Sequence, residues 1–252
     1  MRWPWQRKRQ SVDTSPITEI IDANVALAAR LDDEQRGLHL EHTIDLIANK
    51  HWEGAANFEL TDEIVTTVAG NAAIPILGLG SWPYRQVRAI IVHPTTTTAR
   101  NVRGRASAGA VSDEEVSVIG LASPYSGPLS VSWDAALGGS LRPKFGRNVI
   151  IHEFAHKIDM TDGAADGVPP LRPPVLGQWE AVLMSEYERT KVRESDEALR
   201  DYAWTNRAEF FAVATEAFFT QPVHLRAAKS DLYGCMTAFY NQDPARWGEK
   251  ST

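Results

Sequence analysis

Two histidines four residues apart, with a glutamate between them, are the residues of this sequence best suited to chemistry. They are His152, Glu153 and His156, within the stretch 148–159. On an α-helix, side chains four residues apart lie one turn above each other, so both imidazoles can reach a single metal ion. Glu153 then points beside that ion, where a carboxylate can accept a proton from a metal-bound water. The spacing predicts a zinc site.

An apolar run comes directly before the two histidines. Val149, Ile150 and Ile151 make the start of the predicted helix hydrophobic, which suits a helix buried inside a domain rather than one on the surface. The alternative is a chance pair of histidines on a solvated helix, and the apolar context argues against it. Buried histidines need a compensating partner, and a metal ion supplies one.

A third protein ligand must join the two histidines, because catalytic zinc usually takes three protein ligands and leaves one position for water. Asp162 follows the helix, as in zinc peptidases with a glycine turn before the third ligand, but that turn needs glycine where this chain has Asp159. Glu209 and Glu216 lie two turns apart on one face of a later predicted helix. Glu209 can also form a capping box with Asn206. Spacing alone does not decide whether Glu209 or Glu216 is the third ligand.

The elements that must position these residues indicate an α+β fold. Apolar residues at helical spacing predict helices over residues 17–50, 62–73, 179–194 and 205–220. Runs of β-branched residues predict strands over residues 87–92, 115–122 and 127–133. These strands would form a small antiparallel or mixed sheet just before the metal-binding helix. Proline and glycine predict a break made by Pro75, Gly78 and Gly80, a long loop over 160–177 and a helix end at Pro222.

Two further features of this pattern concern binding. Leu129 to Trp133 is a candidate sheet edge to which a peptide can add its backbone, although these residues serve equally well as a core strand. His39 and His42 lie three residues apart on a predicted helix, without a third ligand at a suitable spacing. We expect them to be ordinary exposed histidines.

Composition excludes several classes of protein. The chain has 252 residues, of which 43% are hydrophobic and 23% charged, and its net charge of -6 gives no basic footprint for nucleic acid. Its single cysteine, Cys235, cannot form an internal disulfide. The basic start is not followed by an apolar run, and no later window is apolar enough for a membrane span. We therefore expect a cytoplasmic protein that binds no nucleic acid and has no membrane span.

The domain organisation predicted from this pattern is simple. Residues 1–16 form a flexible N-terminus, and residues 17–252 form one domain. Within it, residues 17–80 are a helical N-terminal part, 81–160 the sheet with the active-site helix, and 161–252 a loop and a helical C-terminal part.

A resemblance to a known family covers the chain from end to end. The matching segments are His152 to Met160, Asp162-Gly163, Gly167 to Pro169, Ala208 to Val213, Phe218-Phe219, Trp3 to Trp5, Gly127-Pro128, Ser132-Trp133 and Gln242 to Pro244. Together they resemble the Mlc titration factor A family of bacterial zinc peptidases. The metal and second-helix segments are also similar, over a shorter span, to the catalytic domain of anthrax lethal factor.

This resemblance implies a zincin-like fold and a peptidase of the gluzincin type. In that type, the first glutamate of the second helix, here Glu209, completes the zinc shell, so Glu216 would have a supporting role. The family also places a tyrosine seven residues before that glutamate, at Tyr202, where its phenol can donate a hydrogen bond to the developing oxyanion. The lethal factor type has an acidic residue where this chain has Val213. A carboxylate that supports the histidines must therefore come from elsewhere, with Asp159 or Glu216 as candidates.

The function that follows is peptide-bond hydrolysis with Zn²⁺ as cofactor, with an aminopeptidase-like preference that comes from the resemblance. The expected partner is a peptide or protein substrate. The family takes its name from binding a sugar-responsive transcriptional repressor, so such a repressor is the second expected partner. The alternative function is a binding protein that sequesters this regulator, with proteolysis secondary.

Overall fold

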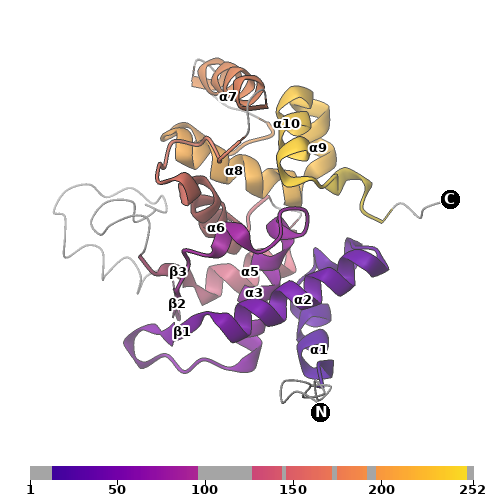
Figure 1. The fold of residues 1–252 in the computed structure, drawn as a ribbon, viewed down its shortest axis with the longest axis vertical. Helices are drawn as coiled ribbons and strands as arrows, with labels where there is room; N and C mark the ends of the chain where they lie inside the picture. The colour runs from indigo at the N-terminus through magenta and orange to yellow at the C-terminus, as the bar shows by residue number, and fades with distance from the viewer. Residues whose placement is uncertain (1–12, 96–126, 144–145, 172–174, 192–196, 249–252) are drawn as a thin grey trace, which may run out of the picture.

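The computed structural model describes residues 13–95, 127–143, 146–171, 175–191 and 197–248. Its helices lie in two groups with α6 between them (Figure 1). The N-terminal group comprises α1 (Ser15–Asn24), α2 (Asp33–Asn49) and α3 (Asp62–Ile76). The central helices are α5 (Trp133–Leu141) and α6 (Val149–Asp159). The C-terminal group comprises α7 (Val175–Lys191), α8 (Arg207–Thr220), α9 (Pro222–Ala228) and α10 (Ser230–Tyr240).

The described strands form one small parallel sheet. Its order is β1 (His51–Gly54), β2 (Ala89–His93), β3 (Leu129–Ser132). Both pairs are parallel, with Ile90 opposite Leu129 and Val92 opposite Val131. The prediction of an antiparallel or mixed sheet was therefore wrong for these strands. Parallel neighbours need long crossover connections, and between β1 and β2 the chain provides one through α3.

Three strand predictions had different outcomes. The strand at 87–92 is present as β2, shifted by a residue or two, and 127–133 contains β3. Trp133 does not belong to the strand, because it starts α5. The strand expected over 115–122 lies outside the described residues. β1 was not predicted, because four residues with exposed and half-buried side chains give little hydrophobic signal.

The N-terminal helices begin at recognisable caps. Asp32 and Gln35 form a capping box at the start of α2. The predicted helix over 17–50 is nevertheless two α-helices, α1 and α2, with a short 3₁₀ turn, η1 (Ala28–Arg30), between them. Thr61 caps α3 through its hydroxyl, which accepts a hydrogen bond from the Ile64 amide.

Helix α3 runs beyond its predicted end at Ala73 to Ile76, and the break predicted from Pro75, Gly78 and Gly80 follows it. The helix continues to Ile76, and Pro75 therefore lies in its last turn, where most carbonyls need outside partners. Gln242 supplies one, because its side-chain amide donates to the carbonyl oxygens of Ile74 at 3.2 Å and Pro75 at 3.1 Å. Burial of nearly the whole of α3 then outweighs the local preference of proline to end a helix.

His39 is buried, which corrects the expectation of an exposed histidine. Its Nε2 lies 2.7 Å from the carbonyl oxygen of Gly70 on the neighbouring α3. Burial lowers the pKa of His39 to about 4, so the ring is neutral near pH 7. His42 is half-buried. Neither residue belongs to a group of metal ligands among the described residues.

The C-terminal half follows the prediction in outline. The loop expected over 160–177 contains the 3₁₀ turn η5 (Met160–Asp162), and the described chain re-enters a helix at Val175. The helix expected over 205–220 is α8. Pro222 follows the end of α8 and also opens α9, since proline is well tolerated in the first turn of a helix.

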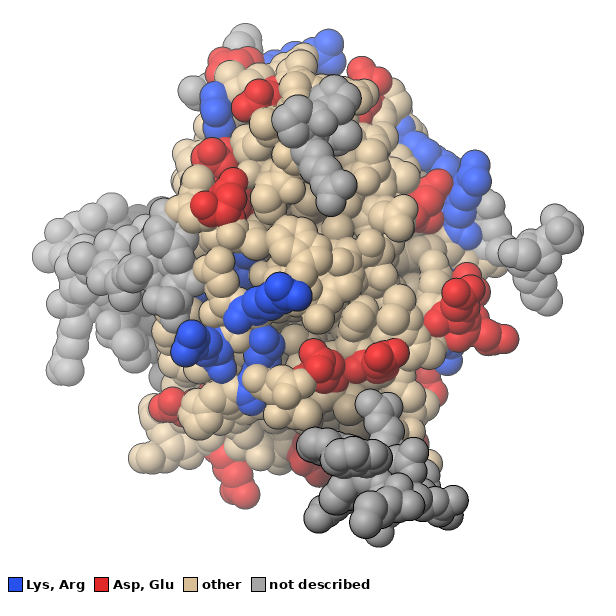
Figure 2. Space-filling model, in the orientation of Figure 1, with Lys and Arg blue, Asp and Glu red and all other residues tan. Residues whose placement is uncertain are grey.

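The surface agrees with the mixed charge of the composition. Figure 2 shows acidic and basic side chains interspersed over one face, where a small group of Lys and Arg residues has acidic neighbours. This face therefore has no continuous basic stripe of the kind that nucleic-acid binding needs. Among the described helices, none combines the length and hydrophobicity required to cross a bilayer.

Candidate metal centre

Helix α6 presents the two histidines from the interior of the molecule. Asn148 caps the helix, with its side-chain oxygen accepting a hydrogen bond from the Ile151 amide at 3.1 Å. Ile150, Ile151, Phe154 and Ile158 are fully buried, and α6 packs against both α3 and α8. The apolar lead-in seen in the sequence therefore fixes this helix in the core.

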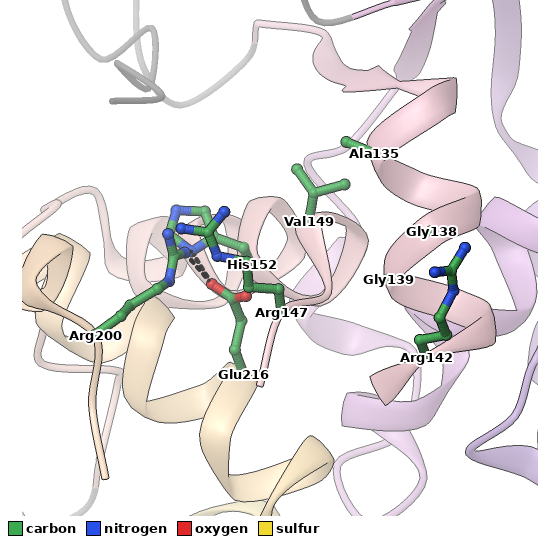
Figure 3. A pocket seen from close by; sticks show the side chains of 9 residues that line it. All are labelled: Ala135, Gly138, Gly139, Arg142, Arg147, Val149, His152, Arg200 and Glu216. Carbon is green, nitrogen blue, oxygen red and sulfur yellow. Dashed lines mark hydrogen bonds and ion pairs between the residues drawn. The ribbon is translucent and has the colours of Figure 1, made fainter. Parts of the chain in front are cut away.

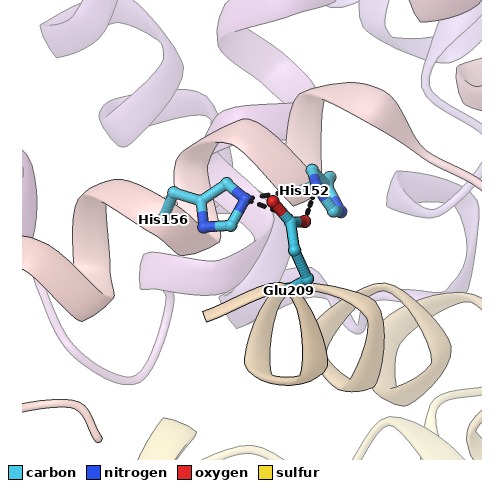
Figure 4. A group of neighbouring side chains, drawn as sticks. All are labelled: His152, His156 and Glu209. Carbon is cyan, nitrogen blue, oxygen red and sulfur yellow. Dashed lines mark hydrogen bonds and ion pairs between the residues drawn. The ribbon is translucent and has the colours of Figure 1, made fainter. Parts of the chain in front are cut away.

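His152 and His156 meet Glu209 of α8 in a compact group (Figure 4). The Nε2 atoms of the two histidines lie 3.2 Å apart. Glu209 Oε2 lies 3.1 Å from His152 Nε2 and 3.3 Å from His156 Nε2. All three residues are buried. The three donor atoms thus form a nearly equilateral triangle that faces one point.

The size of this triangle fits a divalent metal ion. Zinc binds nitrogen and oxygen ligands at about 2.0–2.1 Å in tetrahedral geometry, which separates neighbouring ligand atoms by about 3.3–3.4 Å. The observed separations of 3.1 Å, 3.2 Å and 3.3 Å are close to that value. Glu209 Oε2 is also buried without a hydrogen-bond donor. A buried carboxylate oxygen of this kind needs a positive partner.

The orientation of His152 supports the same conclusion. Its Nδ1 lies 2.6 Å from Glu216 Oε1 and 3.3 Å from an Arg200 nitrogen. Because a carboxylate can only accept, and is the nearer group, Nδ1 carries a proton and donates it to Glu216. In the neutral ring, Nε2 then offers its lone pair toward Glu209. A lone pair and a carboxylate oxygen this close repel each other unless a proton or a cation lies between them.

The pKa values of this group reflect the same attraction for positive charge. Burial lowers the pKa of His152, but the carboxylates of Glu216 and Glu209 outweigh burial and raise it to about 10. Burial raises the pKa of Glu209, but its close contacts with His152 and His156 outweigh burial and lower it to about 2. In the metal-free protein, a proton on His152 therefore neutralises the charge of Glu209, and a bound cation would replace that proton.

Helix α8 positions Glu209 through its N-terminal cap. The side-chain oxygen of Asn206 accepts a hydrogen bond from the Glu209 amide at 2.9 Å. The Glu209 carboxylate faces the histidines and forms no reciprocal bond to Asn206, so the capping box left open by the sequence is only half made. The cap orders the backbone of Glu209 and leaves its carboxylate free to bind a metal.

Glu216 contacts the opposite side of His152 from Glu209, and the sequence alone did not predict this difference. Its Oε1 accepts from His152 Nδ1 and from Arg200, the latter at 2.5 Å (Figure 3). Its Oε2 accepts from the Asn148 amide at 2.9 Å, so one side chain ties α8 to the start of α6. Glu216 therefore orients His152 from the side opposite to Glu209. A carboxylate in this position fixes the tautomer and rotation of a metal-binding histidine.

The other two acidic candidates lie outside the group of three. Asp162 is exposed, and its carboxylate accepts a hydrogen bond from the Ala164 amide at 3.0 Å. Asp159 is buried and accepts from the Gly167 amide at 3.0 Å. Gly167 has a φ of +75°, and a Cβ added to it would lie 2.3 Å from the Arg207 carbonyl oxygen. Asp159 therefore holds the loop after α6 against the start of α8.

Comparison with known proteins assigns the chain to a family. Residues 2–241 match the family described as glucose-regulated metallo-peptidase M90. The chain belongs to the M90 family. Its relatives include an uncharacterized protein, slr2042, of Synechocystis sp. (strain PCC 6803), 34% identical over 231 residues, which cover 89% of this chain and 83% of that protein.

Other relatives of this M90 chain carry the name Mlc titration factor A. That of Pectobacterium atrosepticum is 29% identical over 255 residues, which cover 97% of this chain and 92% of the relative. That of Serratia proteamaculans is 27% identical over 254 residues, which cover 97% and 94%. The resemblance to the Mlc titration factor A family is thus confirmed. The M90 family is one of metallopeptidases, and this M90 chain has a buried group of two histidines and a glutamate that could bind a metal.

The remaining predicted site residues of this M90 chain lie around the group. Glu153 follows His152 on α6 and is half-buried. Tyr202 belongs to the 3₁₀ turn η6 (Asp201–Trp204), and its ring centre lies 6.0 Å from that of His152. Both residues therefore border the group from different elements, α6 and η6.

Arg200 and Asn148 were not predicted as parts of the site. Arg200 binds Glu216, and its guanidinium carbon lies 5.2 Å from the centre of the Tyr202 ring. Nothing in the local sequence distinguishes Arg200 from the other arginines, because its role depends on α8 and η6 meeting in space. Asn148 does carry a signal, since asparagine directly before an apolar helical run is a good N-cap.

Proposed function

We propose that this chain is a cytoplasmic, zinc-dependent peptidase with an aminopeptidase-like preference. Membership in a metallopeptidase family supports hydrolysis of peptide bonds. The observation that carries the proposal is the triangle of His152 Nε2, His156 Nε2 and Glu209 Oε2, with sides of 3.1–3.3 Å. Three nitrogen and oxygen ligands without cysteine are typical of a catalytic zinc site, which keeps a further position open. Structural zinc sites usually have four protein ligands.

Each residue of the site has a separate task in the proposed reaction. When bound, zinc lowers the pKa of a coordinated water toward about 7 and polarises the scissile carbonyl group. Glu153 accepts the proton that the attacking water loses and later passes it to the leaving amine. The Tyr202 phenol donates a hydrogen bond to the carbonyl oxygen, whose negative charge develops only during attack. Glu216 holds the His152 ring in place throughout.

The edge strand β3 offers a binding position for the peptide substrate. β3 has one neighbouring strand among the described residues, and it contacts α6. We infer that the peptide backbone lies along Leu129–Ser132 and so passes beside α6, the helix that carries the histidines. Backbone pairing to a sheet edge holds a peptide without regard to its side chains.

Replacement of the proposed base tests the mechanism. Glu153→Gln keeps the size of the side chain but cannot accept a proton, so we expect metal content to be unchanged and hydrolysis to fall by at least about a hundredfold. The assay is release of chromophore from amino-acid and peptide substrates, with free and acetylated amino termini compared to test the aminopeptidase preference. Glu34→Gln, on the exposed start of α2, is the control. Full activity in Glu153→Gln would refute the role of Glu153.

A second candidate function is binding of a sugar-responsive transcriptional repressor. The relatives from Pectobacterium and Serratia are named for titration of Mlc, and this name supports the proposal. On this alternative, sequestration of the regulator is the main activity and proteolysis is secondary. A binding assay with purified repressor and Glu153→Gln separates the two, because sequestration needs no proton acceptor. Repressor binding with normal affinity in a protein that cleaves nothing would favour sequestration.

A further inference from the structure

A pocket of about 320 Å³ adjoins the metal centre on the side away from Glu209. His152 and Glu216 line it, so the pocket reaches the ring that we assign to the metal. It lies between α5 and the start of α6 (Figure 3). The pocket therefore borders the Nδ1 side of the His152 ring, where Glu216 and Arg200 lie, and not the Nε2 side that faces Glu209.

The walls of this pocket are strongly basic. Arg142, Arg147 and Arg200 line it, against the single carboxylate of Glu216. Figure 3 shows Arg147 and Arg200 beside His152, and Arg142 across the pocket at the end of α5. Three guanidinium groups from three segments thus surround one space. Guanidinium is the group best suited to paired hydrogen bonds with a carboxylate.

The one carboxylate in the pocket is already occupied. Glu216 accepts hydrogen bonds from His152, Arg200 and the Asn148 amide. Arg142 and Arg147 are exposed, and neither forms an ion pair with any residue that the structure describes. The neighbouring pocket, of about 200 Å³, also has Arg147 and Arg200 in its wall but contains the acidic Glu197. The uncompensated positive charge therefore faces the α5 side.

Two glycines keep the α5 side of the pocket open. A Cβ added to Gly138 would have no atom within 4 Å, so this position faces empty space. A Cβ added to Gly139 would lie 2.8 Å from the carbonyl oxygen of Arg147. Helix α5 and the loop before α6 therefore pack backbone against backbone. This contact brings the pocket close to His152 and leaves room for a ligand.

We propose that this pocket binds a carboxylate of the peptide substrate, either an acidic side chain or the C-terminal carboxylate. This inference rests on the proposed peptidase function and names its substrate class. An extended peptide advances about 3.3–3.6 Å per residue, so a carboxylate one or two residues from the cleaved bond can reach the pocket. Arg142 and Arg147 bind the carboxylate, and Arg200 stays paired with Glu216.

The test compares four short peptides of one sequence. One has an internal aspartate and an amidated C-terminus, one has asparagine instead, and two have neutral side chains with a free or an amidated C-terminus. The variants are Arg142→Gln, Arg147→Gln and Gly138→Leu, which fills the pocket. Arg88→Gln removes an equal charge from an exposed site outside the pocket and is the control.

We expect each pocket variant to raise KM for carboxylate-bearing peptides by roughly tenfold. We expect kcat for these peptides, and both constants for the neutral amidated peptide, to stay unchanged. If KM rises only for the aspartate peptide, the pocket binds an acidic side chain. If KM rises only for the peptide with a free C-terminus, the pocket binds the C-terminal carboxylate. Equal KM values for charged and neutral peptides in the wild type would overturn the proposal.

A binding measurement separates failure of this inference from failure of the peptidase function. Fluorescence anisotropy with labelled peptides and Glu153→Gln protein reports binding even if nothing is cleaved. Tighter binding of the carboxylate peptides, lost in Arg147→Gln combined with Glu153→Gln, supports the pocket whether or not the wild type hydrolyses them. Equal binding of charged and neutral peptides refutes the pocket. Absence of hydrolysis alone refutes only the peptidase function.

Discussion

Replacement of Glu216 by glutamine is the perturbation with the clearest structural consequence. The Glu216 side chain is 1% exposed, and its Oε1 accepts from both His152 Nδ1, at 2.6 Å, and Arg200, at 2.5 Å. Glutamine has the same shape, but it lacks the negative charge and has only one accepting oxygen. Since Oε2 also accepts from the Asn148 amide, at 2.9 Å, Glu216→Gln cannot satisfy all three donors.

The expected loss can be estimated for the metal and for the fold. Removing a carboxylate that orients a metal-binding histidine typically costs 10–100-fold in metal affinity, or about 1.4–2.8 kcal/mol. Hydrogen bonds to charged groups contribute about 1.5–3 kcal/mol each, so the metal-free protein should lose about 2–4 kcal/mol of unfolding free energy. The lower part of that range is favoured because the Arg200 side chain is 21% exposed and can turn toward water.

Two measurements, made on Glu216→Gln and on a control variant, test this prediction. Zinc affinity is measured by competition with a chromogenic chelator, and stability by urea unfolding of the metal-free protein. Glu186→Gln is the control, because it breaks another buried ion pair, with Lys229 at 2.8 Å, away from the candidate centre. We expect Glu186→Gln to lose stability and keep its zinc affinity. Wild-type zinc affinity in Glu216→Gln, or an equal loss in Glu186→Gln, would refute the role assigned to Glu216.

Further predictions concern the glycines of the N-terminal helices and the buried Asp159. Gly37→Ala, which meets no atom within 4 Å in α2, should stabilise the protein by about 1 kcal/mol in urea unfolding. Gly70→Ala places a Cβ 3.0 Å from Val25 Cγ2 and should destabilise it by about 1–3 kcal/mol; equal effects of the two would contradict the packing of α3. Burial raises the pKa of Asp159 to about 7, so the folded state binds its proton more tightly than the unfolded state, and stability is lost as pH rises from about 4 to about 7. Asp159→Asn should therefore gain stability over the wild type, on the order of 4 kcal/mol, between about pH 4 and about pH 8; a difference independent of pH would contradict this.

The sequence was most informative where chemistry depends on local spacing. His152, Glu153 and His156 lie within one helical turn and a half, so their relative positions follow from helix geometry alone. The caps at Asp32 and Asn206 are equally local. Contacts within four or five residues are fixed by the backbone of one element, and sequence reasoning reaches them directly.

The spacing of residues in the sequence does not predict features that depend on contacts between distant segments. Glu209 and Glu216 have the same helical setting, and only the packing of α8 on α6 places one at the Nε2 side of His152 and the other at its Nδ1 side. Resemblance to a family, not the residues themselves, favoured Glu209. Arg200 was missed for the same reason.

The errors in the fold have a common physical origin. The predicted strand direction was wrong because a short apolar run does not indicate whether a turn or a crossover leads to the next strand. The end of α3 was predicted too early because the local preference of Pro75 to end a helix is strong, whereas Gln242 and burial of α3 offset it. His39 was read as exposed because its partner, the Gly70 carbonyl, belongs to another helix.

Quantification of bound zinc in three forms of the purified protein tests the central claim most directly. The forms are the wild type, Glu209→Ala and the control Asp162→Ala, which removes the exposed carboxylate outside the group. The structure predicts one zinc ion per chain in the wild type and in Asp162→Ala, and loss of tightly bound zinc in Glu209→Ala. A wild type without stoichiometric metal, or zinc bound to Glu209→Ala with unchanged affinity, would contradict a centre built from His152, His156 and Glu209.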